Sequence, residues 1–236
     1  MSPSELQHIV AQKHVEIYEA SGPRIEKVRQ LVAGFKDRKK VLDVGCADGS
    51  ILAPFAKVHE LHGVDISEGL IAKASAAGII GLVHDVETKP LPYADGAFDI
   101  VFSGETIEHH VDTDWMLSEL NRVLKPGGIL ILTFPNIRTI LSVGMMLLLD
   151  LPPMYAARYR APHYRDFTLR TIKLALRNQG FDLQKAIGSS FYLPKIGEYG
   201  SWLATLFPSW ANTVIVVAAK SRNAVYSAEE SMGELY

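Results

Sequence analysis

From Lys40 onward, short runs of valine, isoleucine and leucine alternate with stretches of helical periodicity. Runs that are apolar on both faces are typical of parallel strands buried between two layers of helices. The expected strands are residues 41–44, 61–66, 79–84, 98–103, 128–134, 181–187 and 213–219, and the expected helices are residues 50–58, 68–77, 113–124 and 168–179. The pattern therefore predicts an α/β fold with a largely parallel sheet.

Net charge, cysteine content and hydropathy limit which partners and which cellular compartment the sequence indicates. The 236 residues carry a formal net charge of −2, so the composition does not indicate a nucleic-acid binder. The N-terminal residues have no basic start followed by an apolar run, and the single cysteine, Cys46, cannot form an internal disulfide. The most apolar window, residues 140–151, is shorter than the ~20 residues that span a bilayer. We expect a cytoplasmic protein.

The sharpest motif is the segment VLDVGCADGS at residues 41–50. A buried strand enters a turn whose small residues, Gly45, Ala47 and Gly49, let the backbone approach a ligand. We expect a helix to begin behind the turn and to offer its free N–H groups.

Two further acidic residues stand at the ends of the next two expected strands. Asp65 follows Gly45 at a spacing that suits a carboxylate accepting hydrogen bonds from a ribose diol. Asp85 ends the third strand, where a carboxylate can accept from an exocyclic amine such as that of adenine. Three such elements at successive strand ends predict a nucleoside-binding site.

The type of nucleoside follows from the turn itself. A dinucleotide fingerprint in this frame would need glycine at position 50, where Ser50 stands. Asp43, beside the turn, would repel a pyrophosphate but would favour the ammonium group of a methionine moiety. We therefore favour S-adenosylmethionine, with S-adenosylhomocysteine as product, over a nicotinamide cofactor and an oxidoreductase activity.

These residues resemble the class I S-adenosylmethionine-dependent methyltransferases, in their small-molecule branch. The likeness is strong over residues 38–135 and weaker to about residue 219, and HGVDIS, HDVE and LNRVLKPGG add to it. It implies a Rossmann-like three-layer sandwich whose seven-stranded, mostly parallel sheet has an antiparallel last strand. One departure is Ala47, where the family usually has glycine. We expect binding to survive this change and the alanine backbone to avoid a positive φ.

The resemblance also implies which residues bind the cofactor. Residues near the turn would surround its methionine part, and later strand ends would hold its adenosine. By that resemblance, Asp43, Gly45, Cys46 and Gly49, together with Ala47 in the turn, would contact the methionine part, Asp65 and Ile66 the ribose and adenine, Asp85 and Val86 the adenine edge, and Ser103 the cofactor from the fourth strand.

The domain organisation follows from these motifs. Residues 1–37 are expected to form N-terminal helices that cover the cofactor site, interrupted at Gly22 and Pro23, and residues 38–219 the methyltransferase domain. Residues 220–236 are expected to be a polar tail. Within the domain, residues 136–167 interrupt the strand–helix rhythm at the carboxyl edge of the sheet, where such folds bind ligands. We interpret them as a lid or substrate-recognition insertion, with a plain connection as the alternative.

Candidate acceptor-side residues lie in two segments, 105–110 and 163–167. Histidine titrates near neutral pH, so His109 is the first candidate for a base, with Glu105 and His163 beside it. A capping role for the Glu–His pair stays open. Arg165 and Tyr164 could bind the acceptor or anchor the insertion.

The apolar segment 140–154, which includes Met145, leaves several roles open. It could line an acceptor pocket, touch a membrane surface, form a contact in a homodimer, or belong to the core of a monomer. Adjacent His109 and His110 cannot easily chelate one ion, so we expect no metal. The acceptor is expected to be a small molecule, with lipid, quinone-like and sugar-linked compounds all open. The alternative function is a regulatory or escort module that binds the cofactor without turnover.

Overall fold

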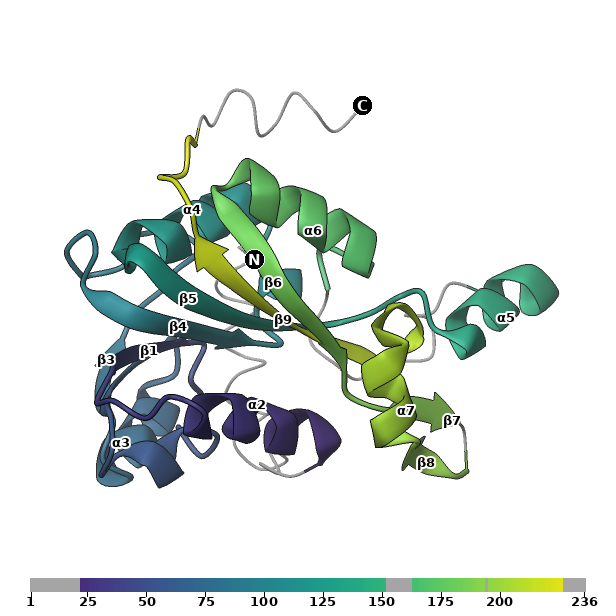
Figure 1. Ribbon diagram of the computed structural model, residues 1–236, viewed down its shortest axis with the longest axis horizontal. Helices are drawn as coiled ribbons and strands as arrows, with labels where there is room; N and C mark the ends of the chain where they lie inside the picture. The colour runs from purple at the N-terminus through teal and green to yellow at the C-terminus, as the bar shows by residue number, and fades with distance from the viewer. Residues whose placement is uncertain (1–21, 152–162, 194, 227–236) are drawn as a thin grey trace.

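The computed structural model describes residues 22–151, 163–193 and 195–226, and these form a twisted sheet with helices on both faces (Figure 1). Seven strands pair in the order β3-β2-β1-β4-β5-β9-β6. The pairs from β3 to β5 are parallel, and β9 runs antiparallel to both β5 and β6. The strands of this sheet are β1 (Lys40–Val44), β2 (Glu60–Asp65), β3 (Ile80–Val83), β4 (Phe98–Gly104), β5 (Leu124–Pro135), β6 (Phe181–Gly188) and β9 (Thr213–Lys220).

This arrangement confirms the expected seven-stranded sheet with its antiparallel last strand in the chain. All seven expected strands are present, with bounds within a few residues of those predicted. The helices are α2 (Pro23–Ala33), α3 (Glu68–Ala76), α4 (Thr113–Val123), α5 (Ile140–Leu149), α6 (Leu169–Asn178) and α7 (Ser201–Leu206). The other expected N-terminal helix falls within residues 1–21, outside the described residues.

The core consists of two apolar layers, one on each face of the sheet. Helices α4 and α6 pack on one face and α2 and α3 on the other (Figure 1). Neighbouring residues of a strand point to opposite faces. Val41 and Ile100 accordingly pack in the layer of α2, whereas Leu42 and Val101 pack in the layer of α4. Burial on both faces explains why the strands are apolar throughout.

The expected helix at residues 50–58 is wrong. A short 3-10 helix, η1 (Ala53–Phe55), takes its place. The physical reason is Pro54, which lacks an N–H group and whose ring would clash with the carbonyl of Ser50 in an α-helix. The preceding residue, Ala53, is also steered away from α-helical dihedrals. The turn after β1 is therefore followed by further turns and a short 3-10 helix rather than by the N-terminus of an α-helix.

Several smaller elements lie beyond the carboxyl ends of the parallel strands (Figure 1). They are α5, which stands apart from the others, α7, which packs on β6, and a two-stranded sheet of β7 (Phe191–Leu193) and β8 (Gly197–Tyr199). The insertion at 136–167 has its two ends joined, because Asn136 bridges to Phe167 and the Ile137 N–H donates to the Phe167 carbonyl at 3.0 Å. Residues 152–162 of the insertion lie outside the described residues.

No helix within the described ranges 22–151, 163–193 and 195–226 has the length and apolarity needed to cross a membrane.

Candidate functional site

The turn after β1 is a left-handed bend held against β2. Gly45, Ala47 and Gly49 have φ values of 76°, 48° and 74°. The N–H groups of Gly45 and Cys46 donate to the Val64 carbonyl at 2.9 and 3.0 Å. The expectation that alanine would avoid a positive φ at position 47 is wrong. The bend fixes it there despite a cost of about 1–2 kcal/mol for a residue with a Cβ.

Gly45 also brings the turn close to the segment that follows β4. A Cβ atom at this position would lie 2.5 Å from Oγ1 of Thr106, far inside van der Waals contact. Thr106 donates from the same hydroxyl to the Gly104 carbonyl at 3.2 Å. Glycine at position 45 therefore lets the turn after β1 contact Thr106, in the candidate acceptor segment 105–110.

Asp65 ties the end of β2 to the turn. Its Oδ2 accepts from the Ala47 N–H at 3.0 Å, and its Oδ1 accepts from the Ser67 N–H at 2.9 Å. Burial raises the pKa of this carboxyl, and the two backbone donors oppose the rise. Because each carboxylate oxygen has two lone pairs, Asp65 can hold the turn and still accept from ribose hydroxyls.

Asp43 is a buried carboxylate with no hydrogen-bond partner among the described residues. Its side chain is 1% exposed, and both oxygens lack a donor there. Burial raises its pKa well above the ordinary value, Asp65 raises it further, and Arg24 of α2 lowers it. A buried polar group without a partner is costly, so such a group in a native structure indicates a ligand-binding role. The ammonium end of S-adenosylmethionine fits this donor-poor position.

Ser103, at the end of β4, is fully buried, and its hydroxyl has no partner among the described residues. β1 and β4 are paired so that Ser103 lies beside Val44, at the start of the turn. The structure thus places Ser103 next to the start of the turn, which follows Asp43 at the end of β1.

The adenine-side candidates follow β2 and β3. The Asp85 oxygens accept from the Glu87 N–H at 3.0 Å and from the Thr88 hydroxyl at 2.8 Å, so this carboxylate already shapes the turn after β3. Val86 is buried, and Ile66 is partly exposed directly after β2. These residues lie at neighbouring strand ends, and their contacts with adenine stay a prediction.

Cys46 lies buried inside the turn. Burial, together with the nearby Asp43 and Asp65, raises the pKa of its thiol above the usual range. The thiolate is the nucleophilic form, so this environment favours a packing role for Cys46.

On the acceptor side, Glu105 has a left-handed backbone conformation with a φ of 54°. Its N–H donates to the Thr133 carbonyl at 3.0 Å, and its Oε1 accepts from the Thr133 hydroxyl at 3.1 Å. The Arg24 guanidinium lies 3.4 Å from the same hydroxyl. Strained backbone held by such contacts is common at functional sites. Because it contacts the Thr133 hydroxyl, the Arg24 side chain extends from α2 to the ends of β4 and β5.

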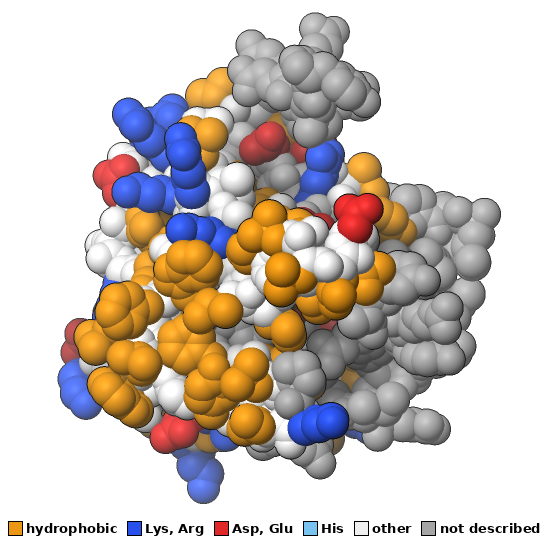
Figure 2. Space-filling view, turned by 90° about the vertical axis from the view of Figure 1, so that its right-hand side faces the viewer, with side chains coloured by type: hydrophobic (Ala, Val, Ile, Leu, Met, Phe, Trp, Pro, Cys, Tyr) orange, Lys and Arg blue, Asp and Glu red, His pale blue; other side chains and the backbone are white. Residues whose placement is uncertain are grey.

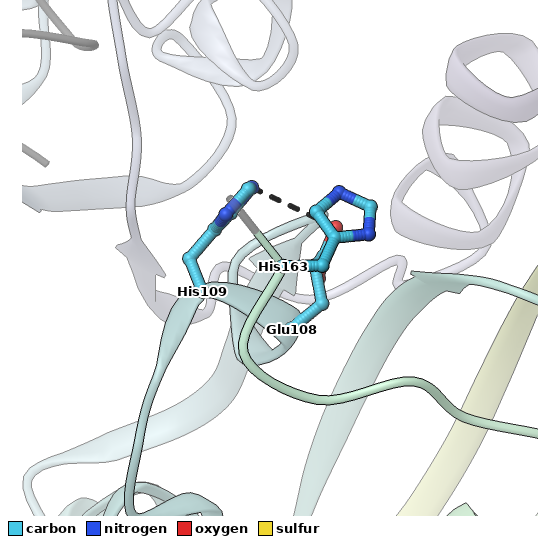
Figure 3. Close-up of side chains that lie close together, drawn as sticks. All are labelled: Glu108, His109 and His163. Carbon is cyan, nitrogen blue, oxygen red and sulfur yellow. Dashed lines mark ion pairs between the residues drawn. The ribbon is translucent and has the colours of Figure 1, made fainter. Parts of the chain in front are cut away.

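Three side chains meet just beyond this point, and we call them the Glu–His cluster: Glu108, His109 and His163. Figure 3 shows them close together, with the two imidazoles meeting edge to face. The ring centroids are 5.0 Å apart, and Nε2 of His109 lies 3.9 Å from Oε1 of Glu108. Glu108 is 1% exposed, and neither carboxylate oxygen has a hydrogen-bond partner among the described residues. Burial, followed by the nearby Glu105, raises its pKa.

Backbone contacts hold the cluster together. The N–H groups of Tyr164 and Arg165 donate to the Glu108 carbonyl at 2.9 and 3.2 Å. The Arg165 guanidinium donates twice to the Val111 carbonyl, at 3.2 and 3.1 Å. In this structure Arg165 and Tyr164 therefore anchor the insertion, and their predicted contacts with an acceptor stay untested.

Other predicted residues lie apart from the cluster. Met145 is half-buried on α5, none of whose ten residues, all described, is buried. The core alternative for the 140–151 segment therefore does not apply to this helix. His110 turns away from His109 and pairs with Glu87.

Sequence reasoning missed three site residues: Arg24, Glu108 and Thr133. Glu108 lies inside the candidate segment 105–110, but the sequence does not show that its carboxylate is buried. Arg24 and Thr133 become neighbours only through the packing of α2 across the sheet.

The fold and site define a nucleoside-binding α/β domain with acidic strand ends, and comparison with known proteins gives the class. Residues 42–132 match the family model described as "Methyltransferase domain". Over 114 residues the chain is 31% identical to a ubiquinone biosynthesis O-methyltransferase of Mesorhizobium japonicum, covering 46% of this chain and 45% of the relative. The chain spans about half the length of the curated relatives it matches.

Solved structures share the fold. A SAM-dependent methyltransferase of Thermotoga maritima superposes with a TM-score of 0.62 at 22% identity, covering 83% of this chain and 89% of the other. A magnesium protoporphyrin IX methyltransferase of Synechocystis, crystallised with S-adenosylhomocysteine, gives 0.59 at 18% identity, covering 84% and 82%. Residues 42–132 are therefore a match to a methyltransferase domain, and the chain has the Rossmann-like fold of S-adenosylmethionine-dependent methyltransferases. The expected fold, family and cofactor class are confirmed.

Proposed function

We propose that this chain transfers a methyl group from S-adenosylmethionine to the hydroxyl of an apolar small molecule. The observation that carries the proposal is Asp43, a buried carboxylate without a partner among the described residues, at the entrance of the left-handed turn. An ammonium group supplies the charge and the donors that this position lacks.

Different residues of the chain would bind different parts of the cofactor. Asp43 would hold the ammonium group and Asp65 the ribose hydroxyls, with Asp85 and Val86 at the adenine edge. When bound, S-adenosylmethionine supplies a methyl group on a positively charged sulfur, and loss of that methyl leaves the neutral thioether of S-adenosylhomocysteine. The protein mainly has to align the acceptor, and alignment can lower such a barrier by about 7–11 kcal/mol.

A hydroxyl acceptor must also lose its proton. His109, Glu105 and His163 stand beside the segment that touches the cofactor turn, so this region supplies groups that can take the proton. The O-methyltransferase name of the Mesorhizobium relative supports a hydroxyl acceptor, although that name belongs to a protein only partly covered by this chain.

An apolar acceptor is supported by the surface beyond the carboxyl edge of the sheet. Figure 2 shows hydrophobic side chains gathered on this face. On α5, Leu147 and Leu148 are 78% and 83% exposed, and Trp202 of α7 is 73% exposed. A large exposed apolar patch marks a site of ligand, membrane or protein contact. We propose a quinone-like or other lipophilic acceptor.

The same apolar face could meet a membrane surface or a second copy of the chain. Sedimentation with lipid vesicles tests the first, and the elution volume of the full chain tests the second. We place the activity in the cytoplasm, which agrees with a lone, buried Cys46.

The test is calorimetric titration of the chain with S-adenosylmethionine, followed by a turnover assay. The assay measures S-adenosylhomocysteine formed with phenols and catechols that carry alkyl or isoprenoid tails. We expect binding that Asp65→Ala weakens and that Asp182→Ala, an exposed position on β6, leaves intact. Absence of binding would refute the proposal. Binding without turnover across the panel would favour the regulatory module instead.

A further inference from the structure

The Glu–His cluster has the composition and the spacing of a metal site. Glu108, His109 and His163 each offer one ligand atom, and these atoms all lie within 4.8 Å of one another. Two ligands of one tetrahedral zinc ion, each about 2.1 Å from it, lie roughly 3.4 Å apart. Small side-chain rotations would therefore bring the three groups to coordination distance.

A second observation points to a ligand at the same place. Both oxygens of Glu108 are buried without a hydrogen-bond partner among the described residues, and the carboxylate faces the two imidazoles (Figure 3). A buried carboxylate is stable when it is paired with a cation or coordinates a metal. His109 and His163 are partly exposed, so the cluster is closed behind Glu108 and open on the imidazole side.

The fold explains why the sequence predicted no metal. The adjacent histidines His109 and His110 point to different partners, because His110 pairs with Glu87. The second imidazole comes from His163, in a distant part of the chain. The backbone bonds from Tyr164 and Arg165 to Glu108 place it there.

We propose that Glu108, His109 and His163 bind one divalent transition-metal ion, with Zn²⁺ as the preferred ion. Two imidazoles and one carboxylate suit zinc and related ions, whereas Mg²⁺ prefers a set of oxygen ligands. Three protein ligands leave a fourth position open, as in catalytic zinc sites.

The use of this metal rests on the proposed function. An acceptor hydroxyl at the open position would lose its proton to solvent more readily, because the ion stabilises the negative oxygen. In that arrangement His109 is a ligand and does not act as the base. The acceptor oxygen would then keep the electron pair with which it attacks the methyl group.

The experiment uses the full chain, treated with chelator and freed of any histidine tag. Co²⁺ is titrated in and followed by its visible absorption, Zn²⁺ then competes for the site, and Mg²⁺ is the comparison ion. We expect saturation at about one equivalent, displacement by Zn²⁺, and no competition by Mg²⁺.

Variants of partly exposed positions connect the signal to the cluster. His163→Ala and His109→Ala should each weaken Co²⁺ binding by about a hundredfold or more, because each removes a ligand. His84→Ala, at the end of β3, is the matched control and should bind as the parent does. Glu108→Gln keeps the shape of the side chain and should also lose the site.

The metal proposal is overturned by absence of saturable Co²⁺ binding, or by binding that survives both histidine variants. Titration with S-adenosylmethionine on the same samples keeps the two proposals apart. Cofactor binding without metal binding refutes only the metal site, and metal binding without cofactor binding refutes only the proposed function.

Discussion

Replacing Asp43 by asparagine should stabilise the ligand-free protein and weaken its binding of S-adenosylmethionine. Asp43 is buried, its oxygens have no hydrogen-bond partner among the described residues, and Asp65 adds a second negative charge nearby. Arg24 is the charge that opposes this cost. The side chain of asparagine has nearly the same shape and no charge, so Asp43→Asn removes the electrostatic penalty and little of the packing.

The expected gain is about 1–3 kcal/mol in the free energy of unfolding at neutral pH, the size of the proton-linkage contribution of one carboxyl with a strongly shifted pKa. For a domain of this size each kcal/mol moves Tm by about 2–4 °C, so the variant should melt roughly 2–12 °C higher. Its affinity for S-adenosylmethionine should fall about 10- to 100-fold, since a charged hydrogen bond contributes about 1.5–3 kcal/mol.

The gain should depend on pH in a defined direction. The folded-state pKa of Asp43 is raised, so the folded protein keeps a proton that the unfolded chain releases. The penalty is therefore absent below about pH 4, near the ordinary aspartate pKa, and grows as the pH rises toward the folded-state pKa. The Tm difference between variant and parent should vanish at low pH.

Differential scanning fluorimetry over a pH series, with and without S-adenosylmethionine, measures all three effects. Asp182→Asn, exposed on β6, is the control and should change neither Tm nor the ligand-induced shift. A lower Tm for Asp43→Asn at neutral pH, or an undiminished shift with the cofactor, would refute the reasoning.

Three further predictions concern the turn, α2 and the apolar face. Ala47→Gly should raise the free energy of unfolding by up to about 1 kcal/mol, because φ is 48° there, and a lower value in urea unfolding would contradict this. Lys27 donates to the carbonyls of Gly188, Ser189 and Ser201 at 2.6–2.9 Å, so Lys27→Met should cost about 1–3 kcal/mol in the same assay, and an unchanged midpoint would exclude that role. Paired serine substitutions at the exposed Leu147 and Leu148 should raise KM for a lipophilic acceptor several-fold at unchanged Tm and cofactor affinity, and an unchanged KM would exclude an acceptor role for the face.

Elements whose signal is local were predictable. The strands of the main sheet have continuous apolar runs, and α3, α4 and α6 begin at side-chain caps, namely Ser67, Asp112 and Thr168. The α-helix expected at residues 50–58 does not form. Its sequence already contains the cause, because Pro54 cannot occupy the interior of an α-helix.

For the 140–151 segment, the sequence shows an apolar run but not what that run packs against. Its apolar residues fit a core helix, a membrane contact and a lipophilic pocket equally well, because hydrophobicity does not state what covers it. Only the fold places α5 beyond the sheet with its leucines exposed.

By itself, the sequence determined the alternation of strands and helices, the small-residue turn and the acidic strand ends, and hence the resemblance to the methyltransferase family. These features depend on neighbours within a few residues, so periodicity and spacing reveal them. The tertiary structure decided that Arg24 reaches Thr133 and that His163 meets Glu108 and His109. Such contacts depend on how distant segments pack, and they cannot be predicted from the pattern of residues along the chain.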